Sequence, residues 1–286
     1  MNIHDLYKPH KTVVSFEIFP PKKDGDINTV YSAIQSLAKL APDFVSVTFG
    51  AGGAEKVTGV TADIVKHIKD IYGIEALAHL TCGGMSTNDT NLIVQDFKQK
   101  GIENILALRG DEVLENGDYR YAKDLIVGLK PHGFGLGAAC YPEGHISCET
   151  LDEDMQHVKQ KQDAGANFLI TQLFFENDVF YRFLDKARAA GVTVPVSAGI
   201  MPMLSRAQIE RMIFMCGVSL PAPIIKLINK YGDQGESLVQ AGVEYACKQM
   251  QDLCDQGVQG IHLYTMNKPA IAEYCMRHLT IKRVSA

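Results

Sequence analysis

Eight short apolar runs recur along this chain, and segments with helical spacing separate them. The runs lack the polar alternation of a half-exposed sheet and are bounded by turn residues, so we interpret them as strands buried on both faces. Parallel strands need long crossover connections, which the helical segments would supply. The predicted strands are residues 13–18, 44–48, 76–81, 105–108, 136–140, 168–171, 194–198 and 261–264.

The predicted helices alternate with these strands, and glycine follows many of them, as helix C-terminal capping requires. Gly73, Gly101, Gly165 and Gly191 are the predicted ends. The interval before the eighth strand is too long for one helix, and prolines divide it, so we expect an extra helix at 223–231. The other predicted helices are 29–40, 60–71, 89–100, 151–164, 179–190 and 235–256.

The repeated strand and helix pattern predicts an α/β fold, a (β/α)8 TIM barrel with one extra helix between strands 7 and 8. No low-complexity linker divides the 286 residues, so we expect a single domain over 1–286. A doubly wound sheet is the alternative fold.

Charge and hydrophobicity restrict the partners. A net charge of -5 and a pI near 6.0 do not indicate the basic surface that nucleic-acid binding requires. The N-terminus has no signal-peptide core and no apolar run spans a membrane. We therefore expect a cytoplasmic protein with a small-molecule partner.

Cysteine and histidine spacing predicts neither disulfides nor a metal site. The 7 cysteines never occur as Cys-x-x-Cys, and the 9 histidines form no His-Glu-x-x-His pattern. There is also no phosphate-binding loop, and Gly133, Gly135 and Gly137 precede or occupy a strand rather than open a helix.

Glu17 is the first catalytic candidate, because it places a carboxylate inside an apolar strand. Such an acid must be paired, protonated or directed into a cavity. Burial raises a carboxyl pKa toward the range that suits a general acid.

Polar residues also follow most other predicted strands, where a barrel forms its active site. Each has a simpler interpretation: a threonine can cap a helix, His79 can be structural, Arg109 and Asp111 can form a local ion pair, and Gln172 can bond a loop. Their shared position is the argument for a site. The residues are Glu17, Thr48, His79, Thr81, Arg109, Asp111, Tyr141, Glu143, His145, Gln172, Tyr264, Thr265 and Asn267.

Seven ordered motifs together resemble the bacterial methylenetetrahydrofolate reductases over nearly the whole chain. They are Ser15-Phe-Glu-Ile-Phe-Pro-Pro21, Val45-Ser-Val-Thr-Phe-Gly-Ala51, His79-Leu-Thr-Cys82, Ala107-Leu-Arg-Gly-Asp111, Ala139-Cys-Tyr-Pro-Glu-Gly-His145, Asp163-Ala-Gly-Ala-Asn-Phe-Leu-Ile-Thr-Gln172 and Tyr264-Thr-Met-Asn267.

The resemblance implies an FAD-binding barrel that reduces 5,10-methylenetetrahydrofolate to 5-methyltetrahydrofolate. NADH or NADPH would supply hydride to FAD in one half-reaction, and folate would accept it in the other, a ping-pong scheme through one site. It further implies a homo-oligomer that serves methionine biosynthesis. We expect no room for the regulatory domain that similar eukaryotic enzymes carry.

The resemblance also assigns roles to residues. It implies that Glu17 is the general acid, that Asp111 lies between flavin and folate, and that Gln172 contacts the pterin and the nicotinamide. Met212, Tyr264 and Lys268 align with further substrate contacts. The implied FAD contacts are Thr48, Phe49, Ala51, His79, Arg109, Gly110, Asp111, Tyr121, Ala122, Tyr141, His145, Asp154, His157 and Lys161.

Four positions depart from the family pattern. The family usually has asparagine where this chain has His157, and arginine where it has Gln160 and Lys268. It usually has an aromatic residue where this chain has Met212. These changes bear on the affinity for FAD and substrate, because lysine lacks the bidentate geometry of arginine and methionine is more adaptable than an aromatic ring.

Two other functions remain alternatives. A pterin-binding barrel could transfer a one-carbon unit without flavin, and a catalytically silent barrel could serve as a binding module. Flavin colour in the purified protein separates the first alternative from the reductase.

Overall fold

The computed structural model describes residues 1–21, 25–49, 59–110, 117–232 and 234–281. In these ranges the strands form one closed parallel barrel in the order β1-β2-β3-β4-β5-β6-β7-β8, which confirms the predicted TIM barrel. The strands are β1 Val13–Ile18, β2 Phe44–Val47, β3 Glu75–Thr81, β4 Asn104–Leu108, β5 Gly135–Cys140, β6 Phe168–Thr171, β7 Val196–Ile200 and β8 Gly260–Tyr264.

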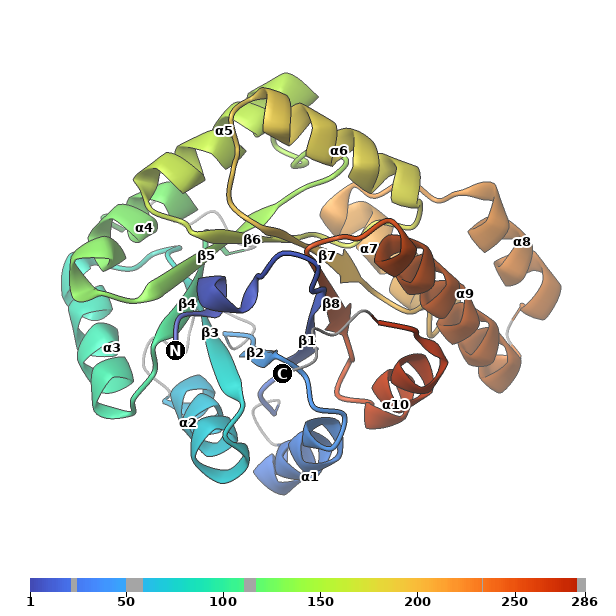
Figure 1. Ribbon diagram of the computed structural model, residues 1–286, viewed down its shortest axis with the longest axis horizontal. Helices are drawn as coiled ribbons and strands as arrows, with labels where there is room; N and C mark the ends of the chain where they lie inside the picture. The colour runs from blue at the N-terminus through green and yellow to red at the C-terminus, as the bar shows by residue number, and fades with distance from the viewer. Residues whose placement is uncertain (22–24, 50–58, 111–116, 233, 282–286) are drawn as a thin grey trace.

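Helices surround the barrel on the outside, as Figure 1 shows. Their amphipathic faces bury apolar residues against the outer faces of the strands. The α-helices are α1 Ile27–Ala38, α2 Val60–Tyr72, α3 Thr87–Gln99, α4 Ala122–Leu129, α5 Leu151–Ala164, α6 Asn177–Ala189, α7 Arg206–Cys216, α8 Ala222–Tyr231, α9 Gly235–Asp255 and α10 Pro269–His278; η1 Ile3–Leu6 and η2 Lys130–His132 are 3-10 helices.

Local signals account for the helix ends. Ser86 caps α3 through a capping box with Asp89. Gly73 ends α2 with φ of 64°, a left-handed conformation that glycine adopts without steric penalty. Ser86 thus starts α3, and Gly73 ends α2 as the sequence predicted.

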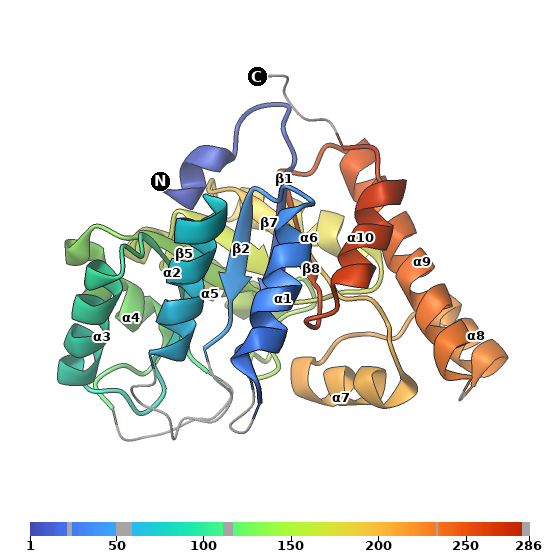
Figure 2. The same ribbon diagram turned by 90° about the horizontal axis from the view of Figure 1, so that it is seen from below.

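The β7–β8 connection contains three helices within the described residues. The extra helix predicted at 223–231 is α8. The additional helix α7 was not among the predicted helices, because only Ile209 is buried along it and its apolar periodicity is correspondingly weak. Figure 2 shows α7 beyond the strands, at the opposite end of the molecule from the N-terminus.

Residues inside the barrel alternate with residues that face the helices. In β1, Val14 and Phe16 belong to the cluster under the helices, whereas Val13 packs inside the barrel with Phe44 and Phe168. The period of two therefore also directs Glu17 inward. The layer at the amino ends of the strands is apolar, and the layer above it is polar.

The 3-10 helix η1 covers the amino-terminal end of the barrel (Figure 1). Ile3 is fully buried there, and its backbone N–H donates to Asn104 Oδ1 at 2.9 Å. Tyr7 Oη lies 2.8 Å from Ser197 Oγ. This end of the barrel is packed, which leaves the carboxyl ends of the strands for a site.

Among the described residues, no helix is long and apolar enough to cross a membrane.

Candidate active site

Glu17 lies in the polar layer of the barrel, in register with Ser46 of β2 and Tyr264 of β8. Its Oε2 is 3.3 Å from His262 Nε2 and 3.5 Å from His79 Nε2, and Ser46 Oγ donates to it at 3.4 Å. Only 6% of the residue is exposed. Strands from three parts of the chain thus place one carboxylate between two imidazoles.

Burial raises the pKa of Glu17, but the hydrogen bond from His262, the charges of His79 and His262 and the Ser46 hydroxyl lower it more, so the net pKa lies below the ordinary 4.5. The predicted upward shift is therefore wrong for this structure. The prediction considered the apolar neighbours in the sequence, whereas the decisive neighbours come from other strands.

His79 is a buried base, and burial lowers the pKa of a base rather than raising it. Burial lowers its pKa from 6.5 to about 4, with Glu17 opposing this shift and His262 adding to it. Within the described residues, His79 Nε2 is buried and has no hydrogen-bond partner. Neutral His79 can therefore still bond a polar group that enters the barrel.

The sequence reasoning missed three residues of this cluster: Ser15, Ser46 and His262. His262 Nδ1 lies 2.8 Å from Ser15 Oγ, which also donates to the Ile261 carbonyl at 3.3 Å. The signal that could have found them is the period of two in a strand, because residues two apart face the same side. Ser15 is two residues before Glu17, and His262 is two residues before Tyr264.

The end of β8 is tied to its neighbours by hydrogen bonds. Tyr264 Oη donates to the Thr171 carbonyl at 2.8 Å, and Thr265 Oγ1 donates to the Glu17 carbonyl at 2.6 Å. Asn267 bonds both the N–H and the C=O of Phe19, each at 2.8 Å. These bonds fix the backbone that carries Glu17, so its orientation depends on barrel closure.

A second polar group follows β5 and contains five predicted residues: Tyr141, His145, Asp154, His157 and Lys161. Lys161 Nζ donates to the Ala139 carbonyl at 2.9 Å and lies 5.4 Å from the centroid of the Tyr141 ring. Burial lowers the pKa of Lys161, while the charge of Asp154 opposes that effect. The lysine is thus a partly buried cation beside a carboxylate.

Asp154 is only 2% exposed, and within the described residues its Oδ2 has no hydrogen-bond partner. Burial raises its pKa, and the charges of Lys161 and His157 oppose the shift. Burial lowers the pKa of His145, and the positive charge of Arg109 lowers it further. Arg109 therefore lies near this second group.

The remaining predicted residues are more dispersed. Gln172 Oε1 accepts from the Leu173 N–H at 2.8 Å. Thr48, Phe49 and Gly110 follow β2 and β4, Tyr121 and Ala122 start α4, and exposed Lys268 precedes α10. Ala51 and Asp111 lie outside the described residues, so their predicted roles stay predictions.

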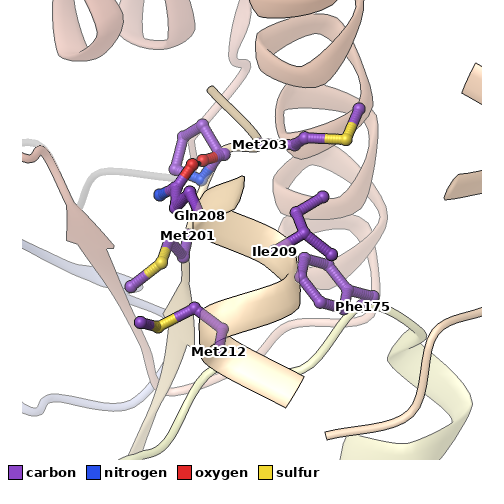
Figure 3. A pocket seen from close by; sticks show the side chains of 7 residues that line it. Phe175, Met201, Met203, Gln208, Ile209 and Met212 are labelled. Carbon is purple, nitrogen blue, oxygen red and sulfur yellow. Dashed lines mark hydrogen bonds between the residues drawn. The ribbon is translucent and has the colours of Figure 1, made fainter. Parts of the chain in front are cut away.

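Met212 lies on α7 and lines a shallow, largely apolar hollow. Figure 3 shows the side chains of Met201 and Met212 on the same side of this hollow, with Phe175 and Ile209 on another. Met212 and Tyr264 pack in the same hydrophobic cluster. The hollow is too small for a cofactor of several rings.

Comparison with known proteins gives one consistent family. Residues 2–279 match the family model of methylenetetrahydrofolate reductase. The 5,10-methylenetetrahydrofolate reductase of Escherichia coli (strain K12) is 36% identical over 93% of this chain and 89% of its own length. Methylenetetrahydrofolate reductase 1 of Schizosaccharomyces pombe is 35% identical over 93% of this chain, which spans 45% of that relative.

A solved structure supports the fold. A Clostridium thermocellum protein, described as uncharacterized and as binding two copies of 5-methyl-5,6,7,8-tetrahydrofolic acid, has a TM-score of 0.66 and 15% sequence identity, with 94% of each chain covered. At this identity the likeness shows the shared barrel.

Proposed function

The chain belongs to the methylenetetrahydrofolate reductase family, and from this premise we propose that it reduces 5,10-methylenetetrahydrofolate to 5-methyltetrahydrofolate with NADH or NADPH as the reductant and FAD as its cofactor. The observation that carries the proposal is the buried cluster of Glu17, His79 and His262 at the barrel mouth. This cluster supports the proposal because a carboxyl group and imidazoles can transfer protons, and barrels bind substrate at this end of their strands.

His79 in β3 and the residues that follow β5 offer polar partners to a cofactor such as FAD. His79 Nε2, 3.5 Å from Glu17 Oε2, and Asp154 Oδ2 are buried and have no hydrogen-bond partner among the described residues. Partly buried Lys161 supplies a cation that suits a diphosphate. His79, Asp154 and Lys161 would hold FAD, with Tyr141 and Arg109 close by. When bound, FAD supplies the hydride transfer that amino acid side chains cannot perform.

The second task is protonation of a folate nitrogen so that the five-membered ring of the substrate opens, and we assign it to Glu17. The lowered pKa of Glu17 leaves the carboxyl ionised at neutral pH in the ligand-free protein, so a proton must reach it. His262 is the nearest side chain, because its Nε2 lies 3.3 Å from Glu17 Oε2.

The Ser15 bond orients that side chain. Ser15 Oγ lies 2.8 Å from His262 Nδ1 and 3.3 Å from the Ile261 carbonyl oxygen, so it holds one edge of the imidazole ring in place. The opposite edge, with Nε2, then faces Glu17 Oε2 at 3.3 Å. Exclusion of water by bound folate would favour the neutral, protonated form of the Glu17 carboxyl.

Two half-reactions test this assignment separately. In Glu17→Gln, reduction of bound FAD by NADH or NADPH should persist, while folate reduction should slow by about 100-fold or more, the usual contribution of a general acid. Stopped-flow absorbance of the flavin follows both steps. Glu103→Gln is the matched control, because Glu103 lies beside the opposite end of the barrel and pairs with Lys69. Folate reduction at the wild-type rate in Glu17→Gln would refute the acid role.

The purified protein tests the cofactor itself. A yellow protein that releases FAD on denaturation supports the proposal, whereas a protein that takes up no FAD refutes it. The same preparation, assayed without oxygen with each nicotinamide in turn, identifies the preferred reductant.

Gln172 and Lys268 are the proposed substrate contacts, and their conservative variants should raise the KM for folate.

We further propose that residues 1–286 act as one catalytic barrel within a cytoplasmic homo-oligomer that supplies methyl groups for methionine biosynthesis. The continuous family match over residues 2–279 supports the single catalytic unit. Light scattering after size-exclusion chromatography measures the oligomeric state, and a monomer at micromolar concentration would contradict the homo-oligomer.

A further inference from the structure

Three side chains with metal-binding atoms meet beside α5: Cys148, Asp154 and His157. Asp154 and His157 are three residues apart on this helix and share one face. Cys148 precedes the helix in a turn closed by its own N–H, which donates to the His145 carbonyl at 2.8 Å. The sequence spacing matches no zinc motif, so the fold rather than the spacing brings the three together.

The distances match the edges of a tetrahedral site. Cys148 Sγ lies 3.5 Å from His157 Nδ1 and 3.8 Å from Asp154 Oδ1. A tetrahedral zinc ion with sulfur at about 2.3 Å and nitrogen at about 2.1 Å separates these two ligand atoms by about 3.6 Å. An ion at the centre of the cluster therefore requires little movement of the side chains.

The unpaired oxygen of Asp154 is a second indication of a missing ligand, which the metal and FAD would supply as alternatives. Asp154 is 2% exposed, and Oδ2 has no partner within the described residues. The Lys161 ammonium donates to the Ala139 carbonyl and makes no hydrogen bond to Oδ2. A buried carboxylate oxygen without a donor is costly, and a cation would satisfy it.

We propose that Cys148, Asp154 and His157 form a binding site for a thiophilic divalent cation such as Zn²⁺. A thiolate, an imidazole and a carboxylate are the ligand set that zinc prefers, and a water molecule completes the fourth position. The Cys148 thiol releases its proton to solvent when the metal binds. Because Asp154 and His157 also belong to the FAD contacts of the proposed function, the metal and FAD exclude each other.

The test uses Co²⁺ as a coloured probe for zinc in protein freed of flavin. One equivalent should give a thiolate-to-cobalt charge-transfer band and the visible absorption of tetrahedral cobalt, and Zn²⁺ should displace both. Cys148→Ala should lose the charge-transfer band and bind the probe at least about 10-fold more weakly. Cys216→Ala is the matched control, because Cys216 is also a half-buried cysteine, and it should retain the band.

Absence of the charge-transfer band, or its persistence in Cys148→Ala, overturns the site. Circular dichroism that matches the wild type confirms that Cys148→Ala is folded. Competition is measured by FAD fluorescence: one equivalent of Zn²⁺ should weaken FAD uptake in the wild type but not in Cys148→Ala. Unchanged FAD affinity with zinc bound overturns the exclusion. A protein that binds cobalt through Cys148 yet takes up no FAD refutes the proposed function and supports the metal site.

Discussion

His79 should make the stability of this protein depend on pH in a defined window. Its folded-state pKa is about 4, compared with 6.5 for an ordinary histidine, so the unfolded chain binds a proton more readily between these values. The free energy of unfolding therefore falls as pH decreases through that window. This cost arises because burial at the barrel mouth favours the neutral ring.

The magnitude follows from the two pKa values. Between about pH 7.5 and about pH 5, one such histidine should lower the free energy of unfolding by about 2 kcal/mol, and the full shift corresponds to about 3 kcal/mol. Glu17 does not interfere above about pH 5, because its pKa is lowered from 4.5. Its own stabilising contribution is lost only at lower pH.

Urea unfolding of flavin-free protein at several pH values measures this effect. His79→Gln removes the titrating ring, so its free energy of unfolding should fall by about 2 kcal/mol less than that of the wild type over the same range. His132→Gln removes a histidine at the end of η2 and should follow the wild-type curve. An unchanged pH slope in His79→Gln would refute the reasoning.

Two further predictions concern packing. In Gly199→Ala the added Cβ would clash with the Thr171 carbonyl oxygen, so urea unfolding should show a free energy of unfolding lower by about 1–3 kcal/mol. Gly235→Ala is the control, because its Cβ meets no atom within 4 Å and its stability should be nearly unchanged. Equal stability of the two variants would contradict the clash. The sulfurs of Cys247 and Cys275 lie 2.9 Å apart and are buried, so hydrogen peroxide should join them in a disulfide with release of water. Mass spectrometry of the peptides that contain Cys247 and Cys275 should show them linked with the loss of two hydrogens, and unlinked peptides after peroxide treatment would contradict this prediction.

The barrel was predictable from the sequence because its signals are local. Apolar runs and glycine helix ends located the strands to within a few residues, although β7 begins at Val196 rather than at the predicted 194. Pro195 explains this difference, since proline has no N–H to donate within a strand. The helix α7 lacked a comparable signal, because its exposed residues include Phe214 and Met215.

The candidate site was only partly predictable. The position of Glu17 followed from its strand, but the direction of its pKa shift depends on His262, which is 245 residues away in the sequence. Likewise, the approach of Cys148 to His157 depends on the turn before α5. Pairings of this kind depend on tertiary structure, and periodicity does not encode them.

The contact between the first and last strands also has a consequence for folding. Glu17 lies on β1, and His262 lies on β8, so during synthesis the acid emerges long before the partner that compensates its burial. A partly synthesised barrel would hold an unpaired carboxylate at an open edge, which disfavours premature collapse around β1. The burial of this carboxylate therefore makes the final strand a condition for a stable core, and a truncated chain should lose its fold together with the Glu17 cluster.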